Sequence, residues 1–194
     1  MYKWKYNTPE GFTNLYMNSD GKYLTGLWFE RSRDSSKHTL ECEEKELSIF
    51  KKTSKWLDIY FSGKNPDFMP KYKIENITQF RKEVIDIMNT IPYGKTITYN
   101  DISKIIATNR GINKMSSQAV GGAVGWNPIC IIIPCHRVVG TNGSLTGYGG
   151  GIQNKISLLR LEGIDMKGFF VWYNQLRVYT ILILYMTSTI AFIF

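Results

Sequence analysis

The 194-residue sequence predicts a two-domain α+β protein, in which strands and one helix come first and further helices follow. Apolar and aromatic segments at residues 12–17 and 23–29 flank the turn sequence Asn18-Ser19-Asp20-Gly21, so they predict two strands. Residues 43–61 carry apolar side chains near helical spacing and predict a helix. Its apolar positions are Leu47, Phe50, Trp56, Leu57 and Tyr60. Ser62-Gly63-Lys64-Asn65-Pro66 ends this helix.

The second domain is expected to be helical and to follow a linker at residues 67–76. Thr78 is a suitable N-cap, and the helix that it starts ends before Pro92-Tyr93-Gly94-Lys95. Its apolar face consists of Phe80, Val84, Ile87, Met88 and Ile91.

Two shorter helices are predicted next, at residues 99–106 and 116–124, with a turn at 109–113. Ile102, Ile105 and Ile106 are expected to face inward in the first of them, and the second is rich in alanine and glycine. Two short helices joined by a glycine-containing turn fit a helix-turn-helix arrangement, although this turn is longer than usual. Two ordinary packed helices are the alternative interpretation.

The domain boundaries follow from these segments and from a change of composition near the C-terminus. We expect an N-terminal domain at residues 1–74, a second domain at 75–170 and an atypical tail at 171–194. Residues 178–194 are uncharged and mostly apolar, at the short limit for a membrane span. The tail is a membrane anchor, a buried terminal element or sequence foreign to the domain. We predict that truncation at Trp172 leaves the protein soluble and active.

The charge of the chain favours a polyanionic partner. The net charge is +8 and the isoelectric point is about 9.3. Residues 77–160 carry 9 basic and 3 acidic side chains, a net charge of +6, whereas residues 1–74 have a net charge of +3. Nucleic acid is the default partner for such a domain, although many unrelated proteins are mildly basic.

The cysteines indicate a reducing compartment. The three cysteines do not suggest a disulfide framework, and the N-terminus has no apolar signal segment. We therefore expect an intracellular protein, cytoplasmic or, in a eukaryote, nuclear. His38 and Cys42 are four residues apart, but two ligands are too few for a structural zinc site, so no metal is expected.

The segment Ile133-Pro134-Cys135-His136-Arg137-Val138-Val139-Gly140 carries the clearest chemical signal. A thiol becomes a good nucleophile when a base takes its proton, and the imidazole of His136 follows Cys135 directly. A small buried cysteine is also a common core residue. The glycine-rich segment at residues 142–151 would let backbone approach a flat ligand closely.

Four motifs together resemble the O6-alkylguanine-DNA alkyltransferases, the methylated-DNA–protein-cysteine methyltransferases. They are Ile91-Pro92-Tyr93-Gly94-Lys95-Thr96 with Tyr99; Ala119-Val120-Gly121-Gly122-Ala123 with Asn127-Pro128; Ile133-Pro134-Cys135-His136-Arg137-Val138; and Gly147-Tyr148-Gly149-Gly150-Gly151 with Leu158-Leu159-Arg160-Leu161-Glu162-Gly163. The resemblance is close over residues 78–163 and loose before them. It implies a ribonuclease-H-like α/β N-terminal domain and a helical winged helix-turn-helix domain with the active site.

The resemblance implies a suicide reaction in DNA repair. An alkyl group moves from O6 of guanine, and also from O4 of thymine, to Cys135 in a single turnover. His136 takes the thiol proton through a water molecule, and Glu162 holds the imidazole. Tyr99 protonates the departing guanine, and Asn127 organises the pocket and the cysteine.

The resemblance also assigns the groups that bind the substrate. Backbone groups of Cys135 and Val138 would read the guanine edge, while Tyr148 and Gly149 would wall the pocket. The base must be flipped out of double-stranded DNA, and Gln118 occupies the position at which the family usually has the intercalating arginine. We expect weaker flipping or weaker DNA affinity as a result. Arg110 and Lys114 are candidates for phosphate contacts, or are plain surface charges.

Two alternatives have different chemistry. A non-catalytic binder of alkylated DNA would normally lack the cysteine, and retention of Cys135, His136 and Glu162 argues against it. A cysteine hydrolase would use Cys135 and His136 but would leave Tyr99, Asn127 and the basic charge unexplained. No cofactor and no protein partner are expected, and the protein is expected to be a monomer.

Overall fold

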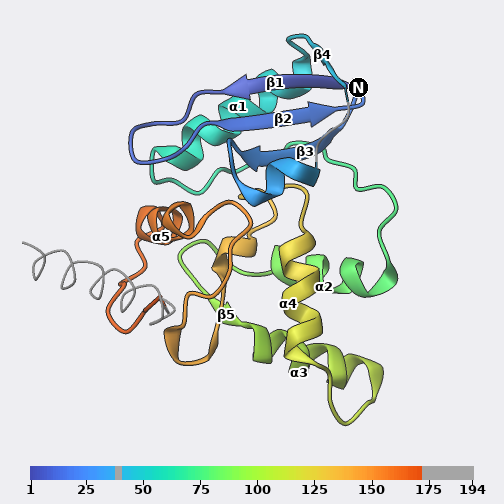
Figure 1. Ribbon diagram of the computed structural model, residues 1–194, viewed down its shortest axis with the longest axis vertical. Helices are drawn as coiled ribbons and strands as arrows, with labels where there is room; N and C mark the ends of the chain where they lie inside the picture. The colour runs from blue at the N-terminus through green and yellow to red at the C-terminus, as the bar shows by residue number, and fades with distance from the viewer. Residues whose placement is uncertain (38–40, 172–194) are drawn as a thin grey trace, which may run out of the picture.

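The computed structural model describes residues 1–37 and 41–171. An upper lobe, with elements from Tyr2 to Phe61, is built on a sheet, and a lower lobe, with elements from Gln79 to Leu161, is helical (Figure 1). The sheet consists of β1 (Tyr2–Tyr6), β2 (Leu15–Ser19), β3 (Leu24–Phe29) and β4 (Glu43–Glu44), in the order β3-β2-β1-β4. β2 is antiparallel to β1 and β3, whereas β4 is parallel to β1. Helix α1 (Ser48–Phe61) lies along one face of the sheet (Figure 1).

The two strands predicted around the turn are confirmed as β2 and β3, while β1 was not predicted. The start of the predicted helix at residues 43–61 is wrong, because Glu43 and Glu44 belong to β4 and the helix begins at Ser48. The backbone N–H of Glu43 donates to the carbonyl of Met1 at 3.1 Å. Pairing with β1, which lies far away in the sequence, therefore decides the conformation of this segment.

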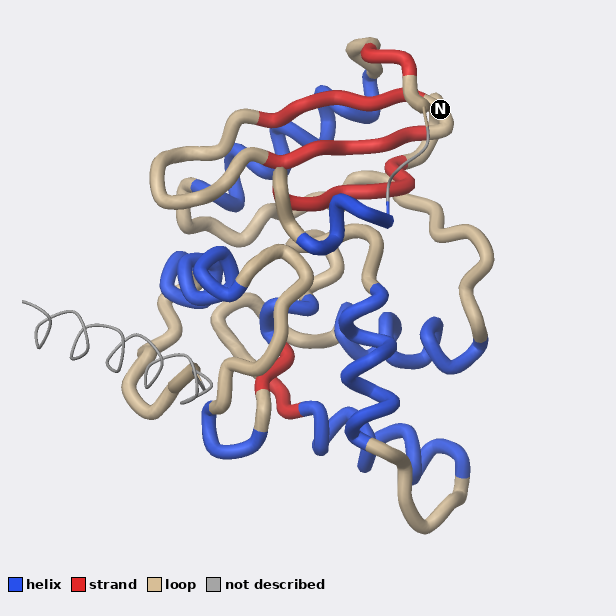
Figure 2. Tube along the Cα trace, in the orientation of Figure 1, coloured by secondary structure: helices blue, strands red, loops and turns tan. Residues whose placement is uncertain are grey.

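The lower lobe is mainly helical, as predicted (Figure 2). Its helices are α2 (Gln79–Asn89), α3 (Tyr99–Arg110), α4 (Ser117–Trp126) and α5 (Ile152–Leu161). Two short parallel strands, β5 (Ile97–Thr98) and β6 (Val138–Val139), form a second small sheet. The 3₁₀ turns are η1 (Arg33–Lys37) in the upper lobe, and η2 (Cys135–Arg137) and η3 (Thr141–Gly143) in the lower one.

Local capping explains where the helices of the lower lobe begin. The side chain of Thr78 accepts a hydrogen bond from the N–H of Arg81 at 3.3 Å, which confirms the predicted start of α2. The side chain of Ser116 caps α4 through the N–H of Ala119 in the same way. Thr98 caps α3 and shares a capping box with Asp101.

Helix α3 is longer than predicted. It continues to Arg110 and ends at Gly111, which has a left-handed φ of 63°. Ile102 and Ile106 are buried as expected, but the inward placement of Ile105 is wrong, because 38% of this residue is exposed.

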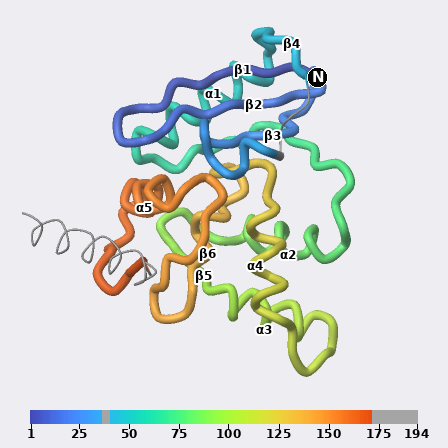
Figure 3. Tube along the Cα trace, viewed as in Figure 1, coloured from blue at the N-terminus to red at the C-terminus, as the bar shows by residue number. Residues whose placement is uncertain are grey.

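The segment that follows α4 in the lower lobe forms backbone hydrogen bonds with β3, the edge strand of the upper sheet. The backbone N–H of Leu27 in β3 donates to the carbonyl of Pro128, and the N–H of Cys130 donates to the carbonyl of Leu27, both at 2.9 Å. One buried apolar cluster includes residues of both lobes, such as Leu27, Tyr60 and Ile129. The segment that leads from α4 to η2 is therefore fixed against the upper lobe (Figure 3).

No helix within residues 1–37 and 41–171 is long and apolar enough to cross a membrane. The tail segment at residues 178–194 and the position of the predicted truncation at Trp172 lie outside the described residues.

Candidate active site

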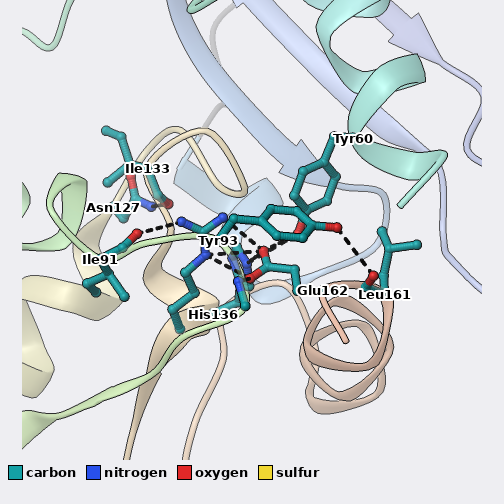
Figure 4. Close-up of polar contacts among 10 residues, drawn as sticks. Tyr60, Ile91, Tyr93, Asn127, Ile133, His136, Leu161 and Glu162 are labelled. Carbon is teal, nitrogen blue, oxygen red and sulfur yellow. Dashed lines mark hydrogen bonds and ion pairs between the residues drawn. The ribbon is translucent and has the colours of Figure 1, made fainter. Parts of the chain in front are cut away.

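Cys135 is the first residue of η2 and is buried, directly after Pro134. The side-chain amide of Asn127, the C-cap of α4, donates from Nδ2 to Sγ of Cys135 at 3.0 Å. It also donates to the carbonyl of Ile133 at 2.9 Å (Figure 4). Its Oδ1 accepts from the N–H of Ile129 at 3.0 Å. Asn127 therefore holds both the loop and the thiol in place.

His136 and Glu162 form a buried pair beside the thiol segment. Nε2 of His136 lies 2.7 Å from Oε1 of Glu162, and neither side chain is exposed (Figure 4). Burial lowers the pKa of His136 and outweighs the opposite effect of Glu162, so the imidazole is neutral near pH 7. Nδ1 is buried with no hydrogen-bond partner among the described residues.

Glu162 is held as a carboxylate by a side-chain donor and a backbone donor in addition to His136. Arg137 donates to both of its oxygens, at 2.9 Å from Nε to Oε2 and at 3.0 Å from Nη2 to Oε1. The N–H of Gly94, in a turn with a φ of 71°, donates to Oε2 at 3.1 Å. Burial raises the pKa of Glu162, but the bonds from His136 and Arg137 prevail and lower it to about 2.

Sequence reasoning missed three buried polar residues around this pair. Tyr60 in α1 donates to Oε1 of Glu162 at 2.7 Å, and Arg137 bridges the carboxylate and the carbonyl of Ile91. Lys155 in α5 is fully buried and donates to the carbonyl of Val138 at 2.7 Å. Burial lowers the pKa of Lys155 to about 8, against the effect of Cys135. A buried hydroxyl or charge requires a partner, so the inward position predicted for Tyr60 was the available signal.

A cavity of about 530 Å³ opens onto Cys135. Its lining brings together five more residues singled out in the sequence: Tyr99, Gln118, Asn127, Tyr148 and Gly149. It also includes Arg33 and Asp34 of the upper lobe, which the sequence did not indicate. The volume lies within the usual range for small-molecule sites.

The hydroxyls of the two cavity tyrosines have few hydrogen bonds among the described residues. The hydroxyl of Tyr99 makes one long hydrogen bond, at 3.4 Å to the carbonyl of Thr146, and burial raises its pKa to about 12. The hydroxyl of Tyr148 has no hydrogen-bond partner among the described residues, and burial raises its pKa well above the usual value. Both hydroxyls are therefore protonated donors at neutral pH.

The wall at Gly149 is built by contact between the lobes. The N–H of Asp34 donates to the carbonyl of Gly149 at 3.3 Å. A Cβ at Gly149 would overlap the carboxylate of Asp34. A larger residue at this point of the wall therefore requires the side chain of Asp34 to move.

Three residues singled out in the sequence lie behind the cavity and do not line it: Val138, His136 and Glu162. The N–H of Val138 donates to the carbonyl of Cys135, and its carbonyl accepts from Lys155. Of the two basic residues considered for phosphate contacts, Arg110 forms an ion pair with Glu83 at 3.0 Å, and Lys114 is exposed.

Fold and site together define a class: an α+β protein that presents a buried cysteine to a cavity, with a histidine–glutamate pair behind it. Residues 79–164 match the family described as 6-O-methylguanine DNA methyltransferase, DNA binding domain. A methylated-DNA–protein-cysteine methyltransferase of Methanosarcina acetivorans is 39% identical over 164 residues, which are 84% of this chain and 99% of that protein. One of Haemophilus influenzae is 35% identical, over 84% of this chain and 87% of that protein.

Solved structures of similar proteins have the same fold over most of this chain. A crystal structure of Mycobacterium tuberculosis OGT in complex with DNA has a TM-score of 0.69 and 33% identity, over 84% of this chain and 92% of that one. A crystal structure of the O6-methylguanine-DNA methyltransferase from the archaeon Pyrococcus kodakaraensis has a TM-score of 0.61 and 26% identity, over 84% of this chain and 99% of that one. The chain belongs to the methylated-DNA–protein-cysteine methyltransferase family.

Proposed function

We propose that this protein repairs alkylated DNA by moving an alkyl group from O6 of guanine to Sγ of Cys135. The observation that carries the proposal is the position of Cys135 in this chain, which belongs to the family. Cys135 faces the cavity, and the side chain of Asn127 donates to its sulfur. Sulfur attacks the alkyl carbon, the S–C bond forms, and the C–O bond to the base breaks. The resulting thioether is stable, so each molecule acts once. The same displacement at O4 of thymine is part of the proposal.

The proton of the thiol passes to His136. Since Glu162 is ionised and accepts at Oε1, Nε2 of His136 carries the hydrogen and Nδ1 carries the lone pair. We propose that Nδ1 takes the proton of Cys135 through one water molecule. The negative charge of Glu162 then stabilises the imidazolium that forms.

The guanine leaves with a proton from Tyr99. The electron pair of the broken C–O bond stays with the base, so protonation at N3 makes guanine a neutral leaving group. A phenol whose pKa is raised to about 12 keeps its proton until a base of comparable strength is in reach. The proposed reaction consists of one displacement at carbon and of proton transfers among water, the base and side chains of this chain, so we propose that it needs neither metal nor cofactor.

Recognition in this proposal uses the cavity wall. Tyr148 and Gly149 enclose the flipped base, with the amide of Gly149 directed at O6, and the backbone of Cys135 reads its edge. The reading role expected for Val138 finds no support, because this residue does not line the cavity and its N–H and carbonyl are both bonded within the protein. Gln118 is exposed at the mouth of the cavity, on α4, where a side chain that fills the gap in the duplex would stand. The substrate is therefore double-stranded DNA that contains O6-alkylguanine.

We assign residues 1–74 to a ribonuclease-H-like domain and residues 75–170 to a winged helix-turn-helix domain. The four-stranded sheet with α1 on one face supports the first assignment. The contact of α3 with α4 and the small sheet β5–β6 beside them support the second. All groups of the site come from one chain, so we propose that the protein acts as a monomer.

Mass spectrometry after incubation with an O6-methylguanine duplex tests the function. We expect a gain of about 14 Da, one CH₂ equivalent, on the peptide that contains Cys135, and no further turnover. Cys135→Ala should abolish the gain, while the matched variant Cys42→Ser should keep it. Unchanged mass with retained binding would favour the non-catalytic binder. Repeated turnover of a peptide or ester would favour a cysteine hydrolase.

A further inference from the structure

We propose that Tyr60 is a positioning residue of the alkyl transfer, through which the upper lobe holds Glu162 and orients His136. This inference rests on the proposed function, because it assigns a residue that supports the tautomer of His136 which Glu162 requires. Tyr60 lies in α1 of the upper lobe, which contains neither the nucleophile nor helices α2 to α5.

The hydrogen bonds of Tyr60 have only one consistent direction. Its hydroxyl lies 2.7 Å from Oε1 of Glu162, and the ionised carboxylate can only accept, so Tyr60 donates. The hydroxyl oxygen also lies 3.3 Å from Nε2 of His136. With its hydrogen directed at Glu162, that oxygen presents a lone pair to the ring. Nε2 therefore faces two acceptors and must carry the hydrogen, which leaves Nδ1 as the basic nitrogen.

The ring of Tyr60 is fixed from several sides. It is fully buried and stacks on Trp56, with centroids 5.3 Å apart and an interplanar angle of 8°. Tyr93 and His136 meet it edge-on, at 6.0 and 6.4 Å. Figure 4 shows Tyr60 directed at Glu162 from beside the α1 ribbon. Since the ring has no room to turn away, the hydroxyl is a fixed donor.

The hydroxyl of Tyr60 also weakens the interaction of Glu162 with the protonated imidazole of His136. Oε1 of Glu162 accepts from Tyr60, His136 and Arg137 together. Removing one donor leaves the carboxylate a stronger partner for the imidazolium. The imidazole would then hold a proton at higher pH and would be available as a base over a narrower range.

The test is single-turnover transfer from an O6-methylguanine duplex to the full-length protein, measured across pH. We expect Tyr60→Phe to slow transfer about tenfold near pH 7, the value of one hydrogen bond of ~1.4 kcal/mol. We also expect the acid limb of its pH profile to move to higher pH. The matched control is Tyr6→Phe, which removes a hydroxyl that donates to Asp58 at 2.8 Å on the same lobe and should change neither quantity.

A double-mutant cycle separates positioning from packing. If Tyr60 acts through Glu162, then adding Tyr60→Phe to Glu162→Gln should slow transfer no further. If the effects multiply and the pH profile of Tyr60→Phe does not move, the role is structural and the inference is wrong. Transfer by Tyr60→Phe at the wild-type rate would also overturn it.

A measurement on the unmodified site keeps the inference testable if Tyr60→Phe does not fold. The sequence contains two histidines, so His38→Gln leaves His136 as the single imidazole for ¹⁵N NMR. We expect Nε2 to carry the hydrogen and Nδ1 to be bare at neutral pH, and the reverse tautomer would contradict the inference. Wild-type protein that transfers no alkyl group would instead refute the proposed function, whichever tautomer is found.

Discussion

Nε2 of His136 lies 2.7 Å from Oε1 of Glu162, and both side chains are excluded from solvent. The pair couples the stability of the fold to pH. The folded pKa of Glu162 is about 2, below its unfolded value, so its contribution is present above about pH 4.5 and is lost as the pH falls toward 2. The folded pKa of His136 is also lowered, so below about pH 6.5 the unfolded chain binds a proton that the folded chain does not.

We therefore predict that the free energy of unfolding falls steadily as the pH is lowered from 7 to 4. Urea denaturation at several pH values measures it. Glu162→Gln should be less stable at pH 7, because Arg137 then lacks its buried counter-charge. Below about pH 4.5 its stability should depend less on pH, because the carboxylate that titrates there is absent. Glu10→Gln, at an exposed position, should behave like the wild type. An equal pH dependence of Glu162→Gln and wild type below about pH 4.5 would show that Glu162 is not its source.

Asn127→Ala should reduce both stability and transfer. The substitution leaves the N–H of Ile129 and the carbonyl of Ile133 buried without this partner, at a cost of roughly 1–3 kcal/mol, and removes a donor to Sγ of Cys135. Thermal melting and single-turnover rates measure the two effects. Asn89→Ala, which removes an exposed contact to Tyr72, is the control. A variant with full activity would refute the role of Asn127.

Tyr99→Phe should slow transfer at least about a hundredfold, the usual contribution of a general acid, and leave the melting temperature unchanged. The physical reason for the second part is that its hydroxyl makes one hydrogen bond of 3.4 Å. Tyr23→Phe, at a half-buried position in the upper lobe, controls for loss of a hydroxyl. Equal transfer rates for Tyr99→Phe and wild type would exclude Tyr99 as the acid.

Gln118→Arg should strengthen DNA binding and make it more sensitive to salt. An added cation at the mouth of the cavity would contact phosphate or fill the duplex, and one phosphate contact steepens the log–log salt slope by about 1. Binding titrations at several salt concentrations measure this slope. Gln79→Arg adds the same charge at an exposed position outside the cavity lining. If both variants gain equally, the effect is one of net charge and Gln118 has no special place.

Gly149→Ala should abolish transfer, and Asp34→Ala should partly restore it. The new methyl group would overlap the carboxylate of Asp34 and displace the cavity wall, which removal of that carboxylate relieves. Transfer rates of the two single variants and the double variant measure the coupling. Gly122→Ala, where a Cβ would meet nothing within 4 Å, is the control. A double variant no better than Gly149→Ala would place the damage elsewhere.

The local elements of the fold were largely predictable. The turn at residues 18–21 predicts β2 and β3, and Thr78 predicts the start of α2, because turn and capping preferences act within a few residues of the chain. The errors lie where distant pairing decides. Glu43 and Glu44 become a strand because β1 is beside them, and Ile105 remains exposed although it continues an apolar pattern.

The sequence by itself singled out the candidate residues for the chemistry, because Cys135, His136 and the glycine-rich loop are recognisable as a motif, and the family resemblance added Glu162. Only the tertiary structure decided what surrounds them. It adds Tyr60 from α1 to the pair that His136 forms with Glu162, and it sets Asp34 against Gly149. A buried polar group requires hydrogen-bond partners. The sequence around it does not specify which residues these are, because folding brings them from distant parts of the chain.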